Sequence, residues 1–145
     1  MTPEPSALVE AARAARGHAY APYSGFAVGA VIATEDGELV SGANFENASY
    51  GLSLCAEAVA LAAANARGLL GRATAIAIVG DAIDKPLGAV VTPCGRCRQM
   101  LLEAEHIAGR PITLYCAPVS GQDGDGIASY ALADLLPHAF GPGSL

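Results

Sequence analysis

Three cysteines and one glutamate have the types and the spacing of a metal site. Cys55 is followed two positions later by Glu57, and Cys94 and Cys97 form a Cys-x-x-Cys pair further along the chain. Zn²⁺ binds about four ligands in a tetrahedron, so three thiolates would leave one position for water, as in catalytic zinc sites. A bound zinc ion lowers the pKa of such a water toward about 7, and Glu57 is close enough to move its proton.

A structural zinc site is the main alternative at these cysteines. Cys116 could supply a fourth thiolate, or the cysteines could be unrelated buried thiols. Structural sites usually take their ligands from two Cys-x-x-Cys pairs, whereas this chain has one. The spacing therefore favours a catalytic site of Cys55, Cys94 and Cys97. Cys116 ends an apolar stretch and is expected to be a buried, inert thiol.

Helices and strands are expected to alternate around these residues. Asp36-Gly37 is the strongest hairpin signal in the chain and joins two predicted strands. Cys55 and Pro93-Cys94 each fall at the start of a predicted helix, whose positive end lowers the pKa of a thiol. The predicted helices cover 6–16, 55–67, 94–105 and 131–136, and the predicted strands cover 26–34, 38–44, 74–80 and 112–116.

The connections between these elements are less regular. Val90 and Val91 are a possible short strand, Pro93 suits the first turn of a helix, and the glycine-rich stretch 120–126 is predicted to be a surface loop. The alternation of strands and helices indicates an α/β fold with a sheet between helix layers. A chain of 145 residues fits one domain, so we expect a single domain over 1–145.

Composition excludes several classes of protein. The formal charge is −6, with 8 Lys and Arg against 14 Asp and Glu, so a nucleic-acid-binding stripe is not expected. The longest apolar run, 58–64, is far shorter than the roughly 20 residues of a membrane span. Residues 1–20 show no secretory signal, so we expect a cytoplasmic protein with reduced cysteines. The alanine-rich apolar fraction of 52% allows an apolar outer face for self-association.

Four blocks of sequence extend the pattern beyond the cysteines. They read YAPYSGFAVGA at 20–30, NFENASYG at 44–51, CGRCRQ at 94–99 and LLPHAFG at 135–141. Together with Cys55-Ala56-Glu57, they resemble the zinc-dependent cytidine deaminases that act on free nucleosides, in the type with three cysteine ligands. The resemblance implies a three-layer α/β/α fold with a central mixed five-stranded sheet, one Zn²⁺ per chain, and a homotetramer with shared active sites.

The resemblance also implies a reaction and residue roles. The reaction is hydrolytic deamination of cytidine and deoxycytidine to uridine and deoxyuridine plus ammonia, a step of pyrimidine salvage. Zinc-bound hydroxide would attack C4 while Glu57 carries protons to N3 and then to the departing amine. Asn44 and Glu46 would hold the ribose 3′-hydroxyl. The remaining substrate-binding residues would be Phe26 within the same chain, and Ala48, Tyr50 and Phe140 at the site of a neighbouring subunit.

One position departs from many three-cysteine members of that family. They carry arginine directly after the catalytic glutamate, where this chain has Ala58. The negative charge of three thiolates is costly to bury without compensation. It must then be offset by helix N-termini, by backbone amides after Cys94, or by Arg96 and Arg98.

Two other functions remain open on the sequence. A deaminase of a nucleoside antibiotic such as blasticidin S would suit the block at 94–99 equally well, although Asn44-Phe45-Glu46-Asn47 and the Leu-Leu-Pro tail favour cytidine. A non-catalytic zinc-binding module would need four cysteine ligands. A nucleotide substrate is disfavoured, because no glycine loop that could cradle a phosphate is evident.

Overall fold

Five strands form one mixed sheet in the computed structural model, which describes residues 1–121 and 124–145. β1 is antiparallel to both of its neighbours, β3 and β4 run parallel, and β5 is antiparallel to β4. The expected mixed five-stranded sheet is therefore confirmed. The spatial order is β2 (Leu39–Ala43), β1 (Phe26–Thr34), β3 (Ala73–Ala82), β4 (Thr113–Ala117) and β5 (Ala128–Ala131).

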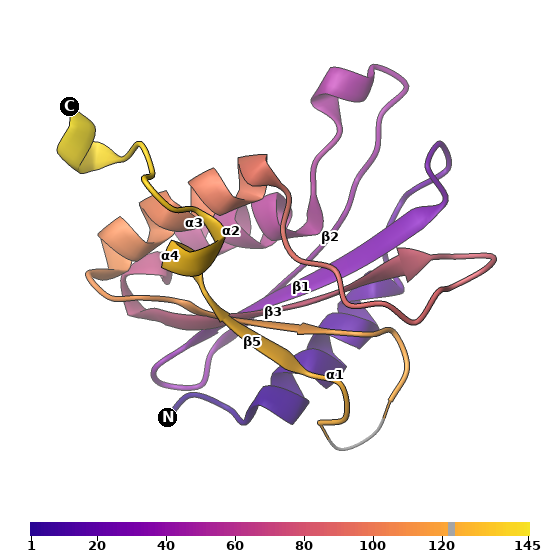
Figure 1. Ribbon diagram of the computed structural model, residues 1–145, viewed down its shortest axis with the longest axis horizontal. Coiled ribbons are helices and arrows are strands. Elements are labelled where there is room, and N and C mark those ends of the chain that lie inside the picture. Colours follow the sequence, from indigo (N-terminus) through magenta and orange to yellow (C-terminus); the bar gives the residue numbers. More distant parts are fainter. Residues whose placement is uncertain (122–123) are drawn as a thin grey trace.

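Helices cover both faces of this sheet. α1 (Pro5–Arg16) lies on one face, and α2 (Ala56–Ala66), α3 (Gly95–Ala108) and the short α4 (Leu132–Leu135) lie on the other (Figure 1). α3 belongs to the crossover that the parallel pair β3 and β4 requires. The three layers match the expected α/β/α arrangement. Short 3₁₀ turns lie at Tyr50–Leu52, Leu70–Arg72 and Pro142–Ser144.

The alternation of side chains along the central strands divides the core in two. Ile76 and Ile78 of β3 belong to the cluster that includes the buried residues of α2 and α3. Ala77 and Val79 belong to the cluster built against α1. Almost every residue of β3 is buried because the strand is covered on both faces, as its apolar sequence predicts.

A close backbone contact sets the depth of α2 on the sheet. Gly42 of β2 faces the start of this helix. A Cβ atom at Gly42 would lie 2.5 Å from the carbonyl oxygen of Ala56 and 2.5 Å from the amide nitrogen of Ala60. Only glycine fits such an approach without displacing the helix. Because Cys55 immediately precedes α2, this contact also determines where the sulfur-bearing end of the helix lies.

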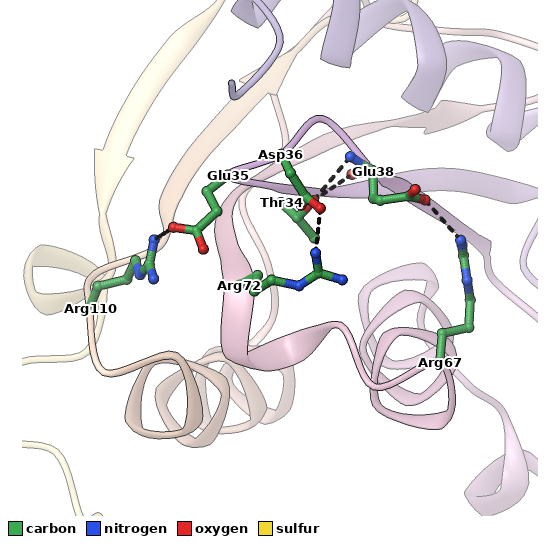
Figure 2. A network of polar contacts seen from close by, with 7 residues as sticks. All are labelled: Thr34, Glu35, Asp36, Glu38, Arg67, Arg72 and Arg110. Carbon is green, nitrogen blue, oxygen red and sulfur yellow. Dashed lines mark hydrogen bonds and ion pairs between the residues drawn. The ribbon is translucent and has the colours of Figure 1, made fainter.

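Three arginines bind the hairpin between β1 and β2, at the far end of β1 from Phe26 (Figure 2). They come from the C-terminal end of α2, the turn before β3, and the segment after α3. All the paired side chains are between about a third and a half exposed. The pairs are Arg67 with Glu38 at 3.1 Å, Arg110 with Glu35 at 2.6 Å, and Arg72 with Asp36.

Several predicted boundaries need correction. The resemblance implied a fifth strand, but the local pattern did not locate β5, because four residues that alternate between half-buried and exposed make no apolar run. Val90 and Val91 lie in an irregular loop rather than in a strand. Pro93 lies outside α3, because Cys94 is the N-cap residue of that helix. α3 also continues past residue 105 until Gly109, whose left-handed φ of 66° ends it.

Further boundaries in the C-terminal third differ from the prediction, and β4 covers Thr113–Ala117 rather than 112–116. The helix predicted over 131–136 is shorter because Ala131 belongs to β5. The loop predicted over 120–126 includes residues 122–123, which lie outside the described residues. Among the residues that the structure does describe, no helix is long and apolar enough to cross a membrane.

Candidate metal centre and substrate cavity

The N-terminal ends of α2 and α3 bring three sulfur atoms together. Cys55 is the N-cap residue of α2, Cys94 is the N-cap residue of α3, and Cys97 lies in the first turn of α3. Their Sγ atoms all lie within 4.8 Å of one another, and those of Cys55 and Cys94 are 3.9 Å apart. Thiolates are preferred ligands of Zn²⁺, and three of them leave one position open. The residues present therefore fit a zinc ion.

The thiols of Cys55 and Cys97 have pKa values that are shifted in opposite directions. The hydrogen bond from Cys97, together with Cys94 and the charge of Arg96, lowers the pKa of the Cys55 thiol to about 6, despite the opposing effect of burial. Donation to Cys55 raises the pKa of Cys97. The cluster thus already favours a thiolate at neutral pH. A bound zinc ion would deprotonate the remaining thiols.

Cys116 takes no part in this cluster. Its side chain is fully buried in β4, and burial raises the pKa of its thiol to about 12. A four-cysteine structural site therefore lacks its fourth ligand. The prediction of an inert buried thiol agrees with this position.

Glu57 lies in the first turn of α2, two residues after Cys55. Its side chain is only 4% exposed. Burial, with the negative charge of Cys55 as a smaller cause, raises the pKa of the carboxyl above its ordinary value. A carboxyl group whose pKa is moved toward neutrality can both accept and give up a proton.

A cavity of about 380 Å³ opens over the sulfur cluster. That volume falls within the range of small-molecule sites in proteins. Predicted site residues that line it are Phe26, Asn44, Glu46, Cys55, Glu57 and Cys94. Lining residues that were not predicted are Ser24, Val28, Ser53, Leu54, Ala56, Ile78, Val91 and Thr92.

Asn44 and Glu46 reach the cavity from one extended segment. Phe45 between them forms bridges with Tyr20 on one side and Leu54 on the other, so this segment is the middle one of three backbone segments that are hydrogen-bonded side by side. Alternate residues of an extended chain point the same way, which places both polar side chains on the cavity side.

Both side chains also fix the backbone around the cavity. Asn44 accepts from the amide of Val28 at 2.9 Å and donates to the carbonyl of Phe26 at 2.8 Å. Glu46 accepts from the amides of Tyr23 and Ser24 and from the Ser24 hydroxyl. The hydroxyl donor is the main cause that holds the pKa of Glu46 below its usual value.

Three predicted binding residues do not line this cavity in their own chain, although Tyr50 lines an adjacent cavity that shares Glu46 and Ser24 with it. Ala48 is exposed, and the ring of Tyr50 is 74% exposed while it contacts Tyr23. Phe140 is 61% exposed, and its carbonyl accepts a hydrogen bond from Gln99. Within one chain the structure therefore does not bring these three residues to the metal cluster.

The two arginines near the cluster differ in their surroundings. Arg96 is exposed and reaches the carbonyl of Ser53 at 3.5 Å. Arg98 is half-buried and donates to the carbonyls of Pro93 and Leu135 and to the hydroxyl of Thr92. Arg98 thus holds the segment that leads into Cys94, a role that sequence spacing did not indicate.

Comparisons with known proteins agree with this geometry. The family model described as "Cytidine and deoxycytidylate deaminase zinc-binding region" matches residues 3–110. A cytidine deaminase of Mycobacterium tuberculosis is 47% identical over 131 residues, which covers 90% of this chain and 84% of the relative. The crystal structure of a cytidine deaminase from Burkholderia pseudomallei has a TM-score of 0.79 at 43% identity, covering 92% of this chain and 97% of that chain.

A blasticidin-S deaminase of Bacillus cereus is also similar, at 35% identity over 77 residues, but this match covers only 51% of this chain and 54% of the relative. The family match spans most of the chain and includes the three clustered cysteines and Glu57. The resemblance seen in the four sequence blocks is thereby confirmed. This chain belongs to the family of zinc-dependent cytidine and deoxycytidylate deaminases.

Proposed function

We propose that this enzyme deaminates cytidine and deoxycytidine hydrolytically, giving uridine and deoxyuridine plus ammonia, within pyrimidine salvage. The observation that carries the proposal is the buried Glu57 carboxyl beside three clustered sulfur atoms, in a cavity large enough for a nucleoside. Relatives that match along most of the chain are cytidine deaminases, whereas the blasticidin-S deaminase match covers about half of it.

Cys55, Cys94 and Cys97 would hold the zinc ion. When bound, Zn²⁺ supplies a water molecule whose pKa is low enough for attack on a ring carbon at neutral pH. The N-terminal ends of α2 and α3 point at this site, and their partial positive charges offset part of the thiolate charge. Arg96 adds a full positive charge near Cys55, which compensates for Ala58 at the position after Glu57.

Glu57 would carry the protons of the reaction. It accepts a proton from the attacking water and delivers it to N3 of the cytosine ring, which makes C4 more electrophilic. It next transfers the remaining proton of the new hydroxyl to the exocyclic amine. The C4–N4 bond then breaks, ammonia leaves, and a carbonyl remains at C4. The raised pKa of this buried carboxyl suits both directions of transfer.

Asn44 and Glu46 would bind the sugar. A carboxylate offers about four lone-pair sites, of which Ser24 and Tyr23 occupy three in Glu46, so one remains for the 3′-hydroxyl. Asn44 uses one of its two amide hydrogens on the carbonyl of Phe26 and keeps the other for a ligand. Since no group assigned here grips the 2′-hydroxyl, both nucleosides should react.

We also propose a homotetramer with active sites shared between subunits. Ala48, Tyr50 and Phe140 are exposed and do not line the cavity over the sulfur cluster in their own chain, which suits a role at the cavity of a neighbouring copy. Further exposed apolar side chains lie on the loops before β1, after β2 and after β3, each of which also contributes residues to the cavity: Tyr20, Tyr23, Phe45, Leu52, Leu54, Ile83 and Leu87. Such a surface is typical of subunit interfaces.

Sedimentation tests this assembly. The protein is expected to sediment at four times the mass of one chain, and activity is expected to fall on dilution as the assembly dissociates. A monomer with full activity would contradict the shared site.

The expected compartment and domain organisation follow from the same features. All four cysteines are free in the described structure, and thiolate ligands persist in a reducing compartment, so we propose a cytoplasmic enzyme. One sheet with one helix layer on each face supports a single domain over residues 1–145.

Substrate turnover tests the function directly. The zinc-loaded protein is incubated separately with cytidine, deoxycytidine and blasticidin S, and the ultraviolet absorbance change on deamination is followed. We expect turnover of both pyrimidine nucleosides and much slower turnover of blasticidin S. Exclusive turnover of blasticidin S would identify the antibiotic deaminase instead. If none of the three reacts although zinc is bound, the deaminase assignment is wrong.

A further inference from the structure

Asp81 near the end of β3 is one of few buried charged side chains among the described residues, at 3% exposure. Its carboxylate accepts three backbone hydrogen bonds, from the amides of Ala82 at 2.8 Å, Leu87 at 3.0 Å and Gly88 at 2.8 Å. These amide donors, with Leu87 as the largest contribution, hold the pKa of the Asp81 carboxyl below its usual range. The carboxylate thereby closes residues 82–88 into a loop.

The closed loop has further supports at its base. Gly88 has a left-handed φ of 72°, which turns its amide toward the carboxylate and is strained for any residue with a side chain. Arg16 of α1 donates to the carbonyl of Asp81 at 2.9 Å and to that of Ala27 at 2.8 Å, so it ties the adjacent ends of β3 and β1 together.

This loop leads directly into the candidate site. Val91 and Thr92 lie a few residues further along and line the cavity, and Pro93 and Cys94 come next in the chain. The amide of Ile83 donates to the carbonyl of Gly25 at 2.8 Å, which joins this loop to the one that Glu46 holds. Within one chain the side chains of 84–90 are exposed, so little apolar packing from that chain fixes this stretch. Its shape depends mainly on the Asp81 carboxylate.

We propose that Asp81 is a positioning residue for the reaction proposed above: by closing the 82–88 loop, it holds Val91 and Thr92 as the wall of the substrate cavity. Asp81 does not itself line the cavity and touches no reacting atom. Loosening its loop should therefore weaken nucleoside binding more than it slows the chemical step, while the sulfur cluster stays intact at the helix ends.

Asp81→Asn tests this role with little change of shape. An amide presents one oxygen and one NH₂ group, so the NH₂ group meets a backbone N–H donor that the carboxylate had satisfied. Asp36→Asn is the matched control, because Asp36 is also hydrogen-bonded and lies at the far hairpin. We expect Asp81→Asn to raise KM for cytidine about tenfold with kcat within about twofold, and Asp36→Asn to change neither.

Gly88→Ala is a second variant that leaves the carboxylate in place. Nothing lies within 4 Å of a Cβ atom at Gly88, so alanine strains only the left-handed backbone. Gly68→Ala is its control, because Gly68 has a similar φ of 69°, equally open surroundings and a place beyond the other end of α2. We expect a higher KM in Gly88→Ala and an unchanged KM in Gly68→Ala.

Two measurements without turnover separate this proposal from the proposed function. Hydrogen exchange at the amides of Leu87 and Gly88 should accelerate at least about tenfold in Asp81→Asn, with bound zinc unchanged. Unchanged exchange, or a KM equal to that of the wild type in both loop variants, overturns the positioning role. If the wild type itself fails to deaminate cytidine, the proposed function falls, and exchange alone decides whether Asp81 holds the loop.

Discussion

The two ends of β1 use acidic side chains in opposite ways. At the hairpin end, three carboxylates are paired with arginines on the surface (Figure 2). At the cavity end, Glu46 and Asp81 accept backbone amides instead, and Glu57 is buried beside the sulfur cluster. Carboxylates near the two ends of one strand thus serve two purposes.

The difference concerns what each carboxylate holds in place. An exposed ion pair joins two flexible side chains and contributes little to stability, because water screens it. A carboxylate that accepts several amides fixes the path of the backbone, and its hydrogen bonds are strengthened by its charge. We therefore expect substitutions at the cavity end to change binding and chemistry, and those at the hairpin end to change stability slightly.

Loss of a metal ligand should have the largest effect at the cavity end. Cys94→Ser removes one of three clustered sulfur atoms, so we expect loss of bound zinc and of activity. Cys116→Ser is the matched control, because Cys116 is buried outside the cluster. Zinc content by metal analysis checks both variants. Retained zinc in Cys94→Ser, or lost zinc in Cys116→Ser, would contradict the three-cysteine centre.

The substitution Glu57→Gln should have the second-largest effect. The amide keeps the shape of the side chain but cannot carry a proton, so we expect turnover of cytidine to fall by about 10²–10⁴-fold with zinc retained. Steady-state rates and metal content of the same preparation check this. Turnover near that of the wild type would show that another group moves the protons.

Glu46→Ala should cost less, because its proposed role is binding. We expect kcat/KM to fall about 10–150-fold on both cytidine and deoxycytidine, since one hydrogen bond to a charged group is lost along with the support of the Ser24 loop. Glu38→Ala at the hairpin is the matched control, and its kcat/KM should be unchanged. A loss on cytidine alone would place Glu46 at the 2′-hydroxyl.

Arg110→Ala should have the smallest effect. Its pair with Glu35 is exposed, so we expect the free energy of unfolding to fall by only about 0.2–1 kcal/mol, with no change in activity. Denaturant unfolding at low salt and at 1 M salt checks this, because salt should remove most of the difference. If the free energy of unfolding falls by more than about 2 kcal/mol at both salt concentrations, the hairpin end is stabilised by buried contacts rather than by exposed ion pairs.

The fold could be predicted where local sequence signals are strong. Asp36-Gly37 marks the hairpin, and the cysteine segments at 55 and 94 mark the beginnings of α2 and α3. β5 lacked such a signal because it is short, with one face half-buried and the other exposed. Its pairing with β4 is a tertiary contact that no local pattern encodes.

The site divides along the same line. Short sequence motifs contain the three clustered cysteines, Glu57, Asn44 and Glu46. The structure places all of these residues in the sulfur cluster or in the wall of the cavity over it. The roles of Asp81 and Arg98 were missed because each depends on hydrogen bonds to backbone groups of a distant or irregular segment. A single Asp ending an apolar strand was the available signal for Asp81.

The contact between Gly42 and α2 also limits how this enzyme can be altered in the laboratory. Because a Cβ atom at Gly42 would lie 2.5 Å from backbone atoms of Ala56 and Ala60, any other residue at position 42 requires the helix and its sulfur ligand to move. Exposed residues between 84 and 90 are free of that constraint. A directed-evolution library for new nucleoside analogues should therefore keep the Gly42 contact constant and diversify the exposed residues 84–86, 89 and 90, which make no hydrogen bond to the Asp81 carboxylate.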